Sequence, residues 1–463
     1  MQQTRRSFLE TAAGAAAAFA LPGCTTVGFD LGAPVDVAAK AHFVKPGEKL
    51  RMGFIGSGGR GGTNLNEFFR LGEEIVALCD VDSDRLAAAA EKVSARCPKV
   101  RRYRDWRDLL DREKDLDAVV VSTPDHMHAA AAIAAMRRGL HVYVEKPLVR
   151  TVHEAERFRK VAEACGVVTQ MGNNGLGTDA LRRSMEILQS GVLGEVSEMH
   201  VVTNRPIWPQ AINRPGGNDT IPDTFDWNLW LGVAPKRPFK KGVYHAFKWR
   251  GWFDFGTGAM GDMACHLISP IWRGLGLERV VSVETVKSTP KFAETYPAAT
   301  TVKLVVTSSR QPKPVEIFWY DGKSGPDEET CRRLTGGVLQ SLTGNDTIVA
   351  GANGVLKGGA HLMMKGERKF IRWQDHPATR DLPVTLPRVK GHHWEFAEAV
   401  RGGARPFSDI DHSVPLTEAV LLGCISQRVG GRLDWNAAKC RFANSEEANA
   451  LLAPYVRPGW TIG

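Results

Sequence analysis

The sequence lacks several features that would direct it to common functional classes. None of its eight cysteines belongs to a Cys-x-x-Cys pair, so the spacing gives no zinc-ribbon or dithiol motif and names no disulfide. The sequence leaves open whether the cysteines are buried free thiols or whether two of them form a disulfide. The sequence also has no internal repeat, and we predict no metal site.

Positive charge is abundant but is not concentrated. The formal net charge is +9, yet no basic block exceeds a few residues and no aromatic-basic motif accompanies the charge. Nucleic-acid binding is therefore not predicted. Hydrophobic residues make up 43% of the 463 residues and charged residues 24%, which is enough for two domains with a buried core.

Residues 1–24 are typical of a twin-arginine export signal. Arg5 and Arg6 precede the small, apolar run Ala12–Leu21, which is too short to span a bilayer. Such signals carry folded proteins, so we predict a periplasmic or cell-envelope location. The residues before Cys24 resemble a lipobox, although Pro22 is unusual in one. The sequence therefore leaves three outcomes open, which are lipidation of Cys24, cleavage nearby and an uncleaved anchor. Residues 25–48 are predicted to be a partly ordered linker.

A predicted buried strand at residues 51–55 runs into the glycine-rich turn 56–61. In a Gly-x-Gly-x-x-Gly turn, Gly56 allows a tight bend, Gly58 lets the backbone approach a pyrophosphate, and Gly61 lets the next helix pack closely. The same pattern occurs in plain glycine turns. Here the strand before it and the helical segment 64–71 after it favour a dinucleotide site.

The second predicted strand, residues 74–79, ends at Asp80, nineteen residues after Gly61. An acid at this place holds a ribose diol and repels a 2′-phosphate, so NAD is favoured over NADP. Arg85 follows closely and could bind such a phosphate.

Strands alternate with helices up to residue 171. Further strands are predicted at 116–121, 141–144 and 167–171, and helices at 84–96, 129–138 and 154–165. This alternation predicts an α/β fold whose first domain, residues 49–172, is a Rossmann domain with a doubly wound parallel sheet. Ligands bind at the C-terminal ends of such strands. The predicted cofactor residues are Gly56, Ser57, Gly58, Gly59, Arg60, Gly61, Asp80, Ser122, Thr123, Pro124, His128, Glu145, Lys146 and Asn173.

Beyond residue 172 the pattern changes. Alternating segments at 195–203, 280–287, 299–307, 315–319 and 369–373 predict a large, mostly antiparallel sheet, and helices are predicted at 259–274, 392–401 and 417–429. We predict that this α+β domain, residues 173–463, closes over the nicotinamide end of the cofactor.

Three residues are candidates for catalysis. Lys146 follows a buried strand and precedes Pro147, whose peptide bond can be cis and can turn the lysine into a cleft. Asp262 and His266 are four residues apart, so on a helix they share a face and can interact. Imidazole is suited to taking a hydroxyl proton, and a carboxylate would stabilise the imidazolium. The structural alternatives are a solvated lysine, a helix-capping Asp262 and a core His266.

The glycine turn together with residues 122–128, 145–147 and 261–266 resembles the Gfo/Idh/MocA oxidoreductase family. Residues 227–232, 248–256 and 441–449 are similar to a twin-arginine-exported branch of it. The resemblance implies a Rossmann domain plus an open-faced α/β domain, a bound nicotinamide dinucleotide, sugar or polyol substrates, and dimers or tetramers. It also implies that Lys146 bridges cofactor and substrate, and that Asp262 and His266 bind substrate and transfer a proton.

Tryptophan and arginine are dense between residues 205 and 252. Aromatic faces stacked on sugar rings, with arginine binding hydroxyls, would suit a carbohydrate cleft, although these tryptophans could instead pack a domain interface. The predicted substrate-binding residues are Arg205, Trp208, Tyr244, Trp249, Arg250, Trp252, Asp262 and His266.

We therefore predict an exported, NAD-dependent oxidoreductase that acts on a secondary hydroxyl of a sugar, polyol or glycoside and holds its cofactor tightly. One alternative is glycoside cleavage through transient oxidation. The other is a carbohydrate-binding protein without catalysis. The sequence leaves open which sugar and which carbon.

Overall fold

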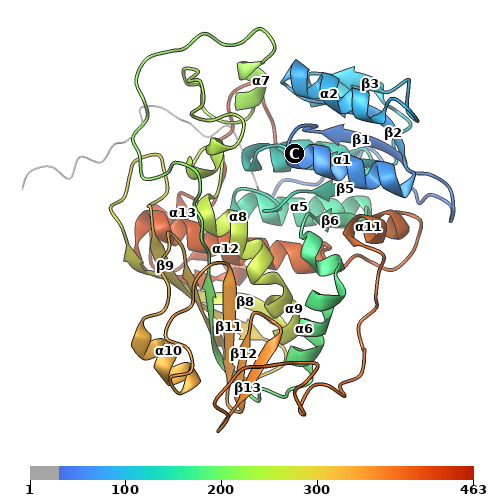
Figure 1. The fold of residues 1–463 in the computed structure, drawn as a ribbon. Helices are drawn as coiled ribbons and strands as arrows, with labels where there is room; N and C mark the ends of the chain where they lie inside the picture. The colour runs from blue at the N-terminus through green and yellow to red at the C-terminus, as the bar shows by residue number, and fades with distance from the viewer. Residues whose placement is uncertain (1–30, 463) are drawn as a thin grey trace, which may run out of the picture.

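A six-stranded parallel sheet forms the first half of the fold in the computed structural model, which describes residues 31–462 (Figure 1). Its strand order is β3-β2-β1-β4-β5-β6, so the predicted doubly wound sheet is confirmed. Strands β4 and β5 are buried along their whole length, as apolar runs in a parallel sheet should be. The strands are β1 Arg51–Ile55, β2 Glu74–Cys79, β3 Arg101–Tyr103, β4 Ala118–Val121, β5 His141–Val144 and β6 Thr169–Met171.

Helices connect these strands and begin at sequence-encoded caps. Thr151 and Glu154 form a capping box at the start of α5, and Gly166 ends that helix with a φ of 70°. The Asp82 side chain caps α2. The helices are α1 Arg60–Leu71, α2 Ser83–Val93, α3 Trp106–Arg112, α4 His128–Arg137 and α5 Val152–Cys165, with a 3₁₀ turn η1 at Asp125–Met127.

The second half contains a ten-stranded sheet in the order β14-β13-β12-β11-β7-β10-β9-β8-β15-β16. Only β7 and β10 pair in parallel, so the predicted mostly antiparallel sheet is confirmed. The strands are β7 Val196–Val202, β8 Leu277–Ser288, β9 Thr300–Ser308, β10 Val315–Tyr320, β11 Asp346–Gly351, β12 Gly354–Lys357, β13 His361–Met364, β14 Ile371–Arg372, β15 Gly431–Asn436 and β16 Arg441–Phe442.

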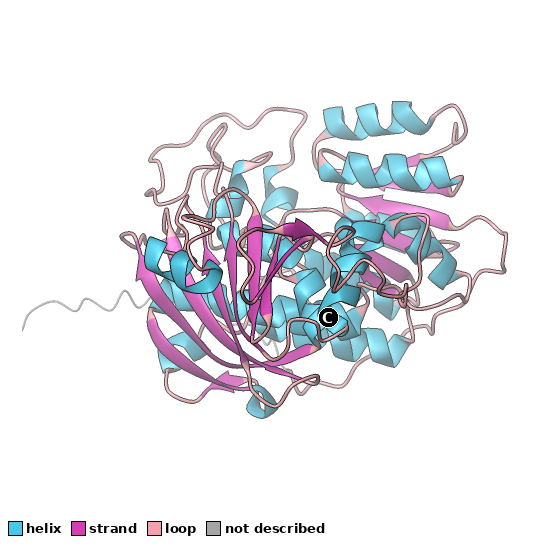
Figure 2. Ribbon diagram, turned by 60° about the horizontal axis from the view of Figure 1, so that its bottom comes forward, coloured by secondary structure: helices cyan, strands magenta, loops and turns pink. Residues whose placement is uncertain are grey.

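Most helices of this half lie on one face of the sheet, whereas α10 packs on the other, where Leu334 joins Val202 and Tyr320 in a separate cluster (Figure 2). Alternate residues of β9 are less buried. Helix α12 contacts β8 and β9 and also α5 and β6 of the first half. One hydrophobic core runs through both halves and includes residues of this helix. The helices are α6 Asp179–Gln189, α7 Trp227–Leu231, α8 Gly258–Leu267, α9 Ser269–Leu275, α10 Glu328–Thr335, α11 His392–Val400, α12 Ile410–Val429 and α13 Glu446–Asn449, with 3₁₀ turns η2 Asn174–Gly177, η3 Lys248–Gly251 and η4 Ala437–Lys439.

Some predicted boundaries were wrong for local reasons. The helix predicted at 259–274 is two helices, α8 and α9, because Pro270 lies in the first turn of α9 and has no N–H to continue α8. Helix α12 begins at Ile410 rather than at residue 417, since the Asp409 side chain caps it there. The strand predicted at 369–373 is only Ile371–Arg372, and the short strands β11, β12 and β13 were not predicted.

Helix α11 packs on the Rossmann sheet, although the sequence placed it in the second domain. Phe396 lies in one core cluster with Phe54, Phe68 and Tyr143, and its ring centroid is 5.9 Å from those of Phe68 and Tyr143. Residues 31–48, part of the predicted linker, also lie against this half. For example, the Val44 N–H donates to the Val400 carbonyl (3.1 Å).

The predicted export signal and Cys24 lie outside the described residues. Within residues 31–462, no helix combines the length and apolar character needed to cross a bilayer, and no three potential metal ligands come together. The seven cysteines of this part of the chain are free thiols.

Replacing Phe396 with alanine should destabilise the protein by about 3–5 kcal/mol, because it leaves a cavity in the Rossmann core. Chemical denaturation measures this change in the free energy of unfolding. Val384→Ala is the control, since that side chain is 65% exposed. Equal stability of the two variants would contradict a core role for α11.

Candidate active site

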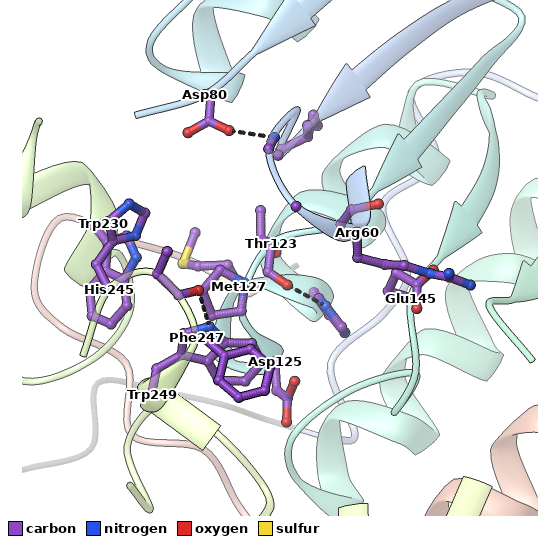
Figure 3. Close-up of a pocket in the computed structure, with 18 of the residues that line it drawn as sticks. Arg60, Asp80, Thr123, Asp125, Met127, Glu145, Trp230, His245, Phe247 and Trp249 are labelled. Atoms are coloured by element: carbon purple, nitrogen blue, oxygen red, sulfur yellow. Dashed lines mark hydrogen bonds and ion pairs between the residues drawn. The ribbon is translucent and has the colours of Figure 1, made fainter. Parts of the chain in front are cut away.

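A cavity of about 590 Å³ opens between the C-terminal ends of the parallel strands and the second half of the chain. Residues that follow β1, β2, β4 and β5 form one side, and residues between 205 and 266 form the other (Figure 3). Doubly wound sheets bind ligands at this place. The predicted site residues that line the cavity are Gly56, Gly58, Gly59, Arg60, Asp80, Ser122, Thr123, Pro124, His128, Glu145, Lys146, Arg205, Trp249, Arg250, Asp262 and His266.

The glycine turn has no room for side chains at two of its glycines. Gly56 has a φ of 84°, and a Cβ there would lie 2.7 Å from the Ser122 carbonyl oxygen. A Cβ on Gly61 would lie 1.8 Å from the Gly56 carbonyl oxygen. The turn is therefore tight, and it brings the start of α1 to the cavity, where free N–H groups can face an anion.

Asp80 holds the shape of this turn. Its Oδ2 accepts hydrogen bonds from the backbone N–H groups of Ser57 (2.9 Å) and Gly58 (3.0 Å), and its Oδ1 accepts one from the Asp82 N–H (3.0 Å). Burial raises the pKa of Asp80, although these three bonds oppose the rise. The carboxylate also lines the cavity, so it can meet a ligand while it braces the turn.

Arg60 and Glu145 form an ion pair across the cavity wall. The Arg60 Nε and the Asn64 Nδ2 each donate to Glu145 Oε1 at 2.9 Å. Burial alone would raise the pKa of Glu145, but the charge of Arg60 and the Asn64 hydrogen bond lower it overall. Glu145 therefore fixes the position of Arg60 beside the glycine turn.

Lys146, Asp262 and Arg250 form the central charged group. Lys146 Nζ donates to Asp262 Oδ1 (2.7 Å) and to the Asp262 carbonyl (2.8 Å), and Arg250 Nε donates to Oδ1 (3.1 Å). Burial opposes ionisation of Asp262, yet the two cations hold its pKa well below the usual range. The Lys146–Pro147 peptide bond is cis. The Asp262 carboxylate thus joins the end of β5 to α8 and η3.

His266 lies one turn after Asp262 on α8 but does not hydrogen-bond to it, and the two interact only through the charge of Asp262, which acts to raise the pKa of His266. Within residues 31–462, the Asp262 side chain bonds to Lys146 and Arg250 instead. Burial, and next the charge of Lys146, lowers the pKa of His266 to about 4. The ring is therefore neutral near pH 7 and able to accept a proton.

Two buried polar atoms of cavity-lining residues have no partner in the described part of the chain. They are Thr123 Oγ1 and Trp106 Nε1. His128 fixes the turn around Thr123, since its Nε2 lies 2.9 Å from the Thr123 carbonyl and its Nδ1 lies 2.8 Å from the Pro147 carbonyl. Orphaned donors, the tight glycine turn and Asp80 together fit a dinucleotide.

Six predicted site residues do not line this cavity: Ser57, Gly61, Asn173, Trp208, Tyr244 and Trp252. Tyr244 and Trp252 are 1% and 0% exposed and pack in an aromatic cluster whose buried members all lie between residues 225 and 255. Asn173 is buried, and its Nδ2 donates to Ser269 Oγ (3.3 Å). Ser57 and Gly61 belong to the glycine turn itself.

The cavity also contains residues that were not among the predicted site residues. They include Arg104, Trp106, Asp125, Met127, Trp230, His245 and Phe247. Asp125 lies inside the 122–128 motif, and its Oδ2 accepts a hydrogen bond from Thr257 Oγ1 (2.7 Å). Trp106 follows β3, a three-residue strand too short and too basic to be recognised as an apolar run.

Two adjoining family descriptions match the chain. Residues 50–173 match the NAD-binding Rossmann fold of the Gfo/Idh/MocA oxidoreductase family, and residues 186–305 match its C-terminal alpha/beta domain. Curated relatives include Glycosyl hydrolase family 109 proteins of Shewanella pealeana (34% identity) and Saccharopolyspora erythraea (33%). Each alignment spans 42% of this chain and less than half of the relative, 45% and 44% respectively.

Solved structures with the same fold include the WlbA dehydrogenase of Bordetella pertussis, in complex with NADH and UDP-GlcNAcA (TM-score 0.59, 18% identity, 85% of this chain and 99% of that one). An inositol dehydrogenase homologue of Azotobacter vinelandii, in complex with NADH and myo-inositol, has a TM-score of 0.56 and 19% identity, and the match covers 86% of this chain and 99% of that one. The aldose-aldose oxidoreductase of Caulobacter crescentus, in complex with glycerol, has a TM-score of 0.55 and 17% identity, and the match covers 84% of this chain and 100% of that one. At these identities the likeness supports the fold alone.

Gly61→Ala should abolish dinucleotide binding, because the new Cβ would collide with the Gly56 carbonyl and open the turn. Gly216→Ala is the control, since a Cβ there would have no atom within 4 Å. Calorimetric titration with NAD measures both affinities. Tight binding by the Gly61 variant would contradict the role of this turn.

His266 should titrate near pH 4, and the Lys146→Met variant should raise its pKa because a nearby cation is lost. NMR of labelled imidazoles, assigned with His266→Gln, measures both values. A folded-state pKa below the usual 6.5 also means that the unfolded chain binds the proton more readily. This histidine therefore contributes stability that is complete above about pH 6.5 and is lost as pH falls toward 4. A pKa at or above 6.5 would contradict the burial argument.

Proposed function

The chain belongs to the Gfo/Idh/MocA oxidoreductase family, and from that premise we propose that it oxidises a secondary hydroxyl of a sugar, polyol or glycoside with NAD. One observation carries the proposal. Lys146 from the first half and Asp262 and His266 from the second line one cavity together with the glycine turn. A neutral imidazole beside a dinucleotide site provides a proton acceptor, and a cation held by a fixed carboxylate can orient the substrate, so the set suits dehydrogenation of an alcohol.

The residues of the cavity have separate tasks in this proposal. The glycine turn and the start of α1 would hold the pyrophosphate, Asp80 the ribose, and Thr123 Oγ1 a polar group of the cofactor. The acid at position 80 favours NAD over NADP. When bound, NAD supplies the acceptor for a hydride from the substrate carbon.

The protein's own residues handle the hydroxyl proton. His266 is neutral, so its ring can accept the proton of the reacting hydroxyl. Lys146 is fixed by two hydrogen bonds to Asp262, and its third N–H can orient the hydroxyl oxygen. Arg250 shares the Asp262 carboxylate and keeps it ionised, which holds the lysine in place.

We also propose that the cofactor stays on the enzyme between turnovers. A segment of the second half, residues 224–245, is joined to the end of β2 beside Asp80. Asp226 N–H donates to the Val81 carbonyl (3.0 Å), Ser83 N–H donates to the Thr224 carbonyl (2.8 Å), and His245 Nε2 lies 3.2 Å from Asp82 Oδ2. These contacts would hinder release of the nucleotide. A captive cofactor also suits export by the twin-arginine route, where free NAD is not expected.

A second candidate is glycoside cleavage without net oxidation, which the name of the curated relatives favours. Oxidation of a ring carbon acidifies the neighbouring C–H, a base removes that proton, and the glycosidic oxygen leaves. Water then adds to the double bond, and return of the hydride restores the hydroxyl. The aglycone is released, while the amount of reduced cofactor stays constant.

Lys146→Ala should keep its NAD but lose at least about a hundredfold in hydride transfer, because substrate orientation is lost. Mass spectrometry of the denatured protein measures the nucleotide, and absorbance of reduced nicotinamide measures transfer from a panel of sugars. Nitrophenyl glycosides test the second candidate by release of nitrophenol. An unchanged rate in the variant would contradict the assignment, and sugar binding that is indifferent to NAD would favour a non-catalytic binder.

A further inference from the structure

Arg205 lines the cavity at the end proposed for the substrate, and no carboxylate of residues 31–462 pairs with its charge. The other cations there and at the glycine turn have carboxylate partners: Arg60 pairs with Glu145, Arg85 with Asp82, and both Lys146 and Arg250 with Asp262. Arg104 bonds only to backbone carbonyls, but it lies after β3 on the Rossmann side. Within residues 31–462, Arg205 makes no ion pair.

The backbone of Arg205 is fixed, while most of its guanidinium is free. Its carbonyl accepts a hydrogen bond from the Gly322 N–H (2.7 Å), and its N–H donates to Thr203 Oγ1 (3.3 Å). In the side chain, only Nη1 has a partner among residues 31–462, the Asn204 Oδ1. The end of β7 therefore presents an arginine with unused N–H groups to the cavity.

Arg250 gives this end of the cavity a second oriented guanidinium. Nε donates to Asp262 Oδ1 and Nη1 to the Phe247 carbonyl, and the guanidinium lies 4.4 Å from the ring centroids of both Phe247 and Trp249. Its Nη2 has no hydrogen-bond partner in the described chain. This packing leaves one edge of the group for a ligand.

The charges at the substrate end do not cancel. Lys146, Arg205 and Arg250 are cations, and the carboxylates are Asp262 and the buried Asp125. One positive charge is left over, and oxidised nicotinamide would add another nearby. In a partly desolvated cavity, such an excess favours an anionic ligand over a neutral one.

We propose that the substrate is an anionic sugar, whose carboxylate or sulfate ester binds to Arg205. This inference rests on the proposed oxidation of a sugar hydroxyl and names the class of sugar. Arginine is suited to the task because its planar fork binds two oxygens of one carboxylate or sulfate. Arg250 Nη2 would contribute a further donor from η3.

The test compares matched sugars on the NAD-loaded enzyme. Methyl hexopyranosides, the corresponding hexuronides and the 6-sulfates are tested in the gluco and galacto series in single-turnover measurements, with reduced nicotinamide as the readout and with KM taken as the half-saturating sugar concentration. We expect a lower KM for the anionic members, and the better of the two anions identifies the group. Arg205→Gln should raise that KM roughly tenfold to a hundredfold, and should raise it more than the KM of the matched neutral sugar, so that the preference for the anionic sugar is lost. Arg310→Gln, an exposed arginine outside the cavity, should change neither.

Two further measurements keep the test decisive. Arg205→Lys retains the charge and should keep part of the preference, and added salt should raise the KM of anionic sugars only. If neutral sugars are oxidised as well as anionic ones, with or without Arg205, the inference is overturned while the proposed oxidation stands. If no sugar of either kind is oxidised by the NAD-loaded protein, the proposed function falls and the inference falls with it.

Discussion

The carboxylate of Asp262 joins the two halves of the site. It accepts hydrogen bonds from Lys146, which follows β5 of the Rossmann sheet, and from Arg250, which belongs to η3. Three partly buried charges are stable together because each is paired, whereas removal of one would leave another uncompensated. Burial is the main cause of the low pKa of His266, and the charge of Lys146 lowers that pKa further. The ion pair thus fixes the position of Lys146 and also contributes to the protonation state of the histidine.

Asp80 likewise connects two parts of the site, at the dinucleotide end of the cavity. The N–H groups of Ser57 and Gly58 donate to its side chain and hold the glycine turn against the end of β2, and the Asp82 N–H donates to its other oxygen. The residue that would contact the ribose therefore also shapes the turn that would contact the pyrophosphate. Segment 224–245 joins the chain directly beyond it, so cofactor recognition and cofactor retention share one short stretch of β2.

The sequence predicted those features that depend on neighbouring residues. Gly56, Asp80, Ser122 and Lys146 all follow apolar strands, so their common location at one sheet edge could be inferred. The partner of Asp262 could not be inferred from spacing, because the carboxylate bonds to a lysine 116 residues away rather than to His266 one turn along.

The aromatic residues show a further limit. Tryptophan density marked the right region, but density does not distinguish Trp249, which lines the cavity, from Trp252, which is fully buried. Helix α11 likewise carries no local signal of where it packs. Such choices are made by tertiary contacts that no short motif records.

The packing of α11 on the Rossmann sheet limits the order in which the two halves can fold. Phe396 completes the cluster around Phe54 and Phe68, yet a ribosome makes it only after nearly all of the second sheet. The nucleotide-binding half thus cannot finish folding as an early, independent unit during synthesis. Its closing contacts are among the most distant in the chain, so the core of this half is complete only after residue 396 has been made.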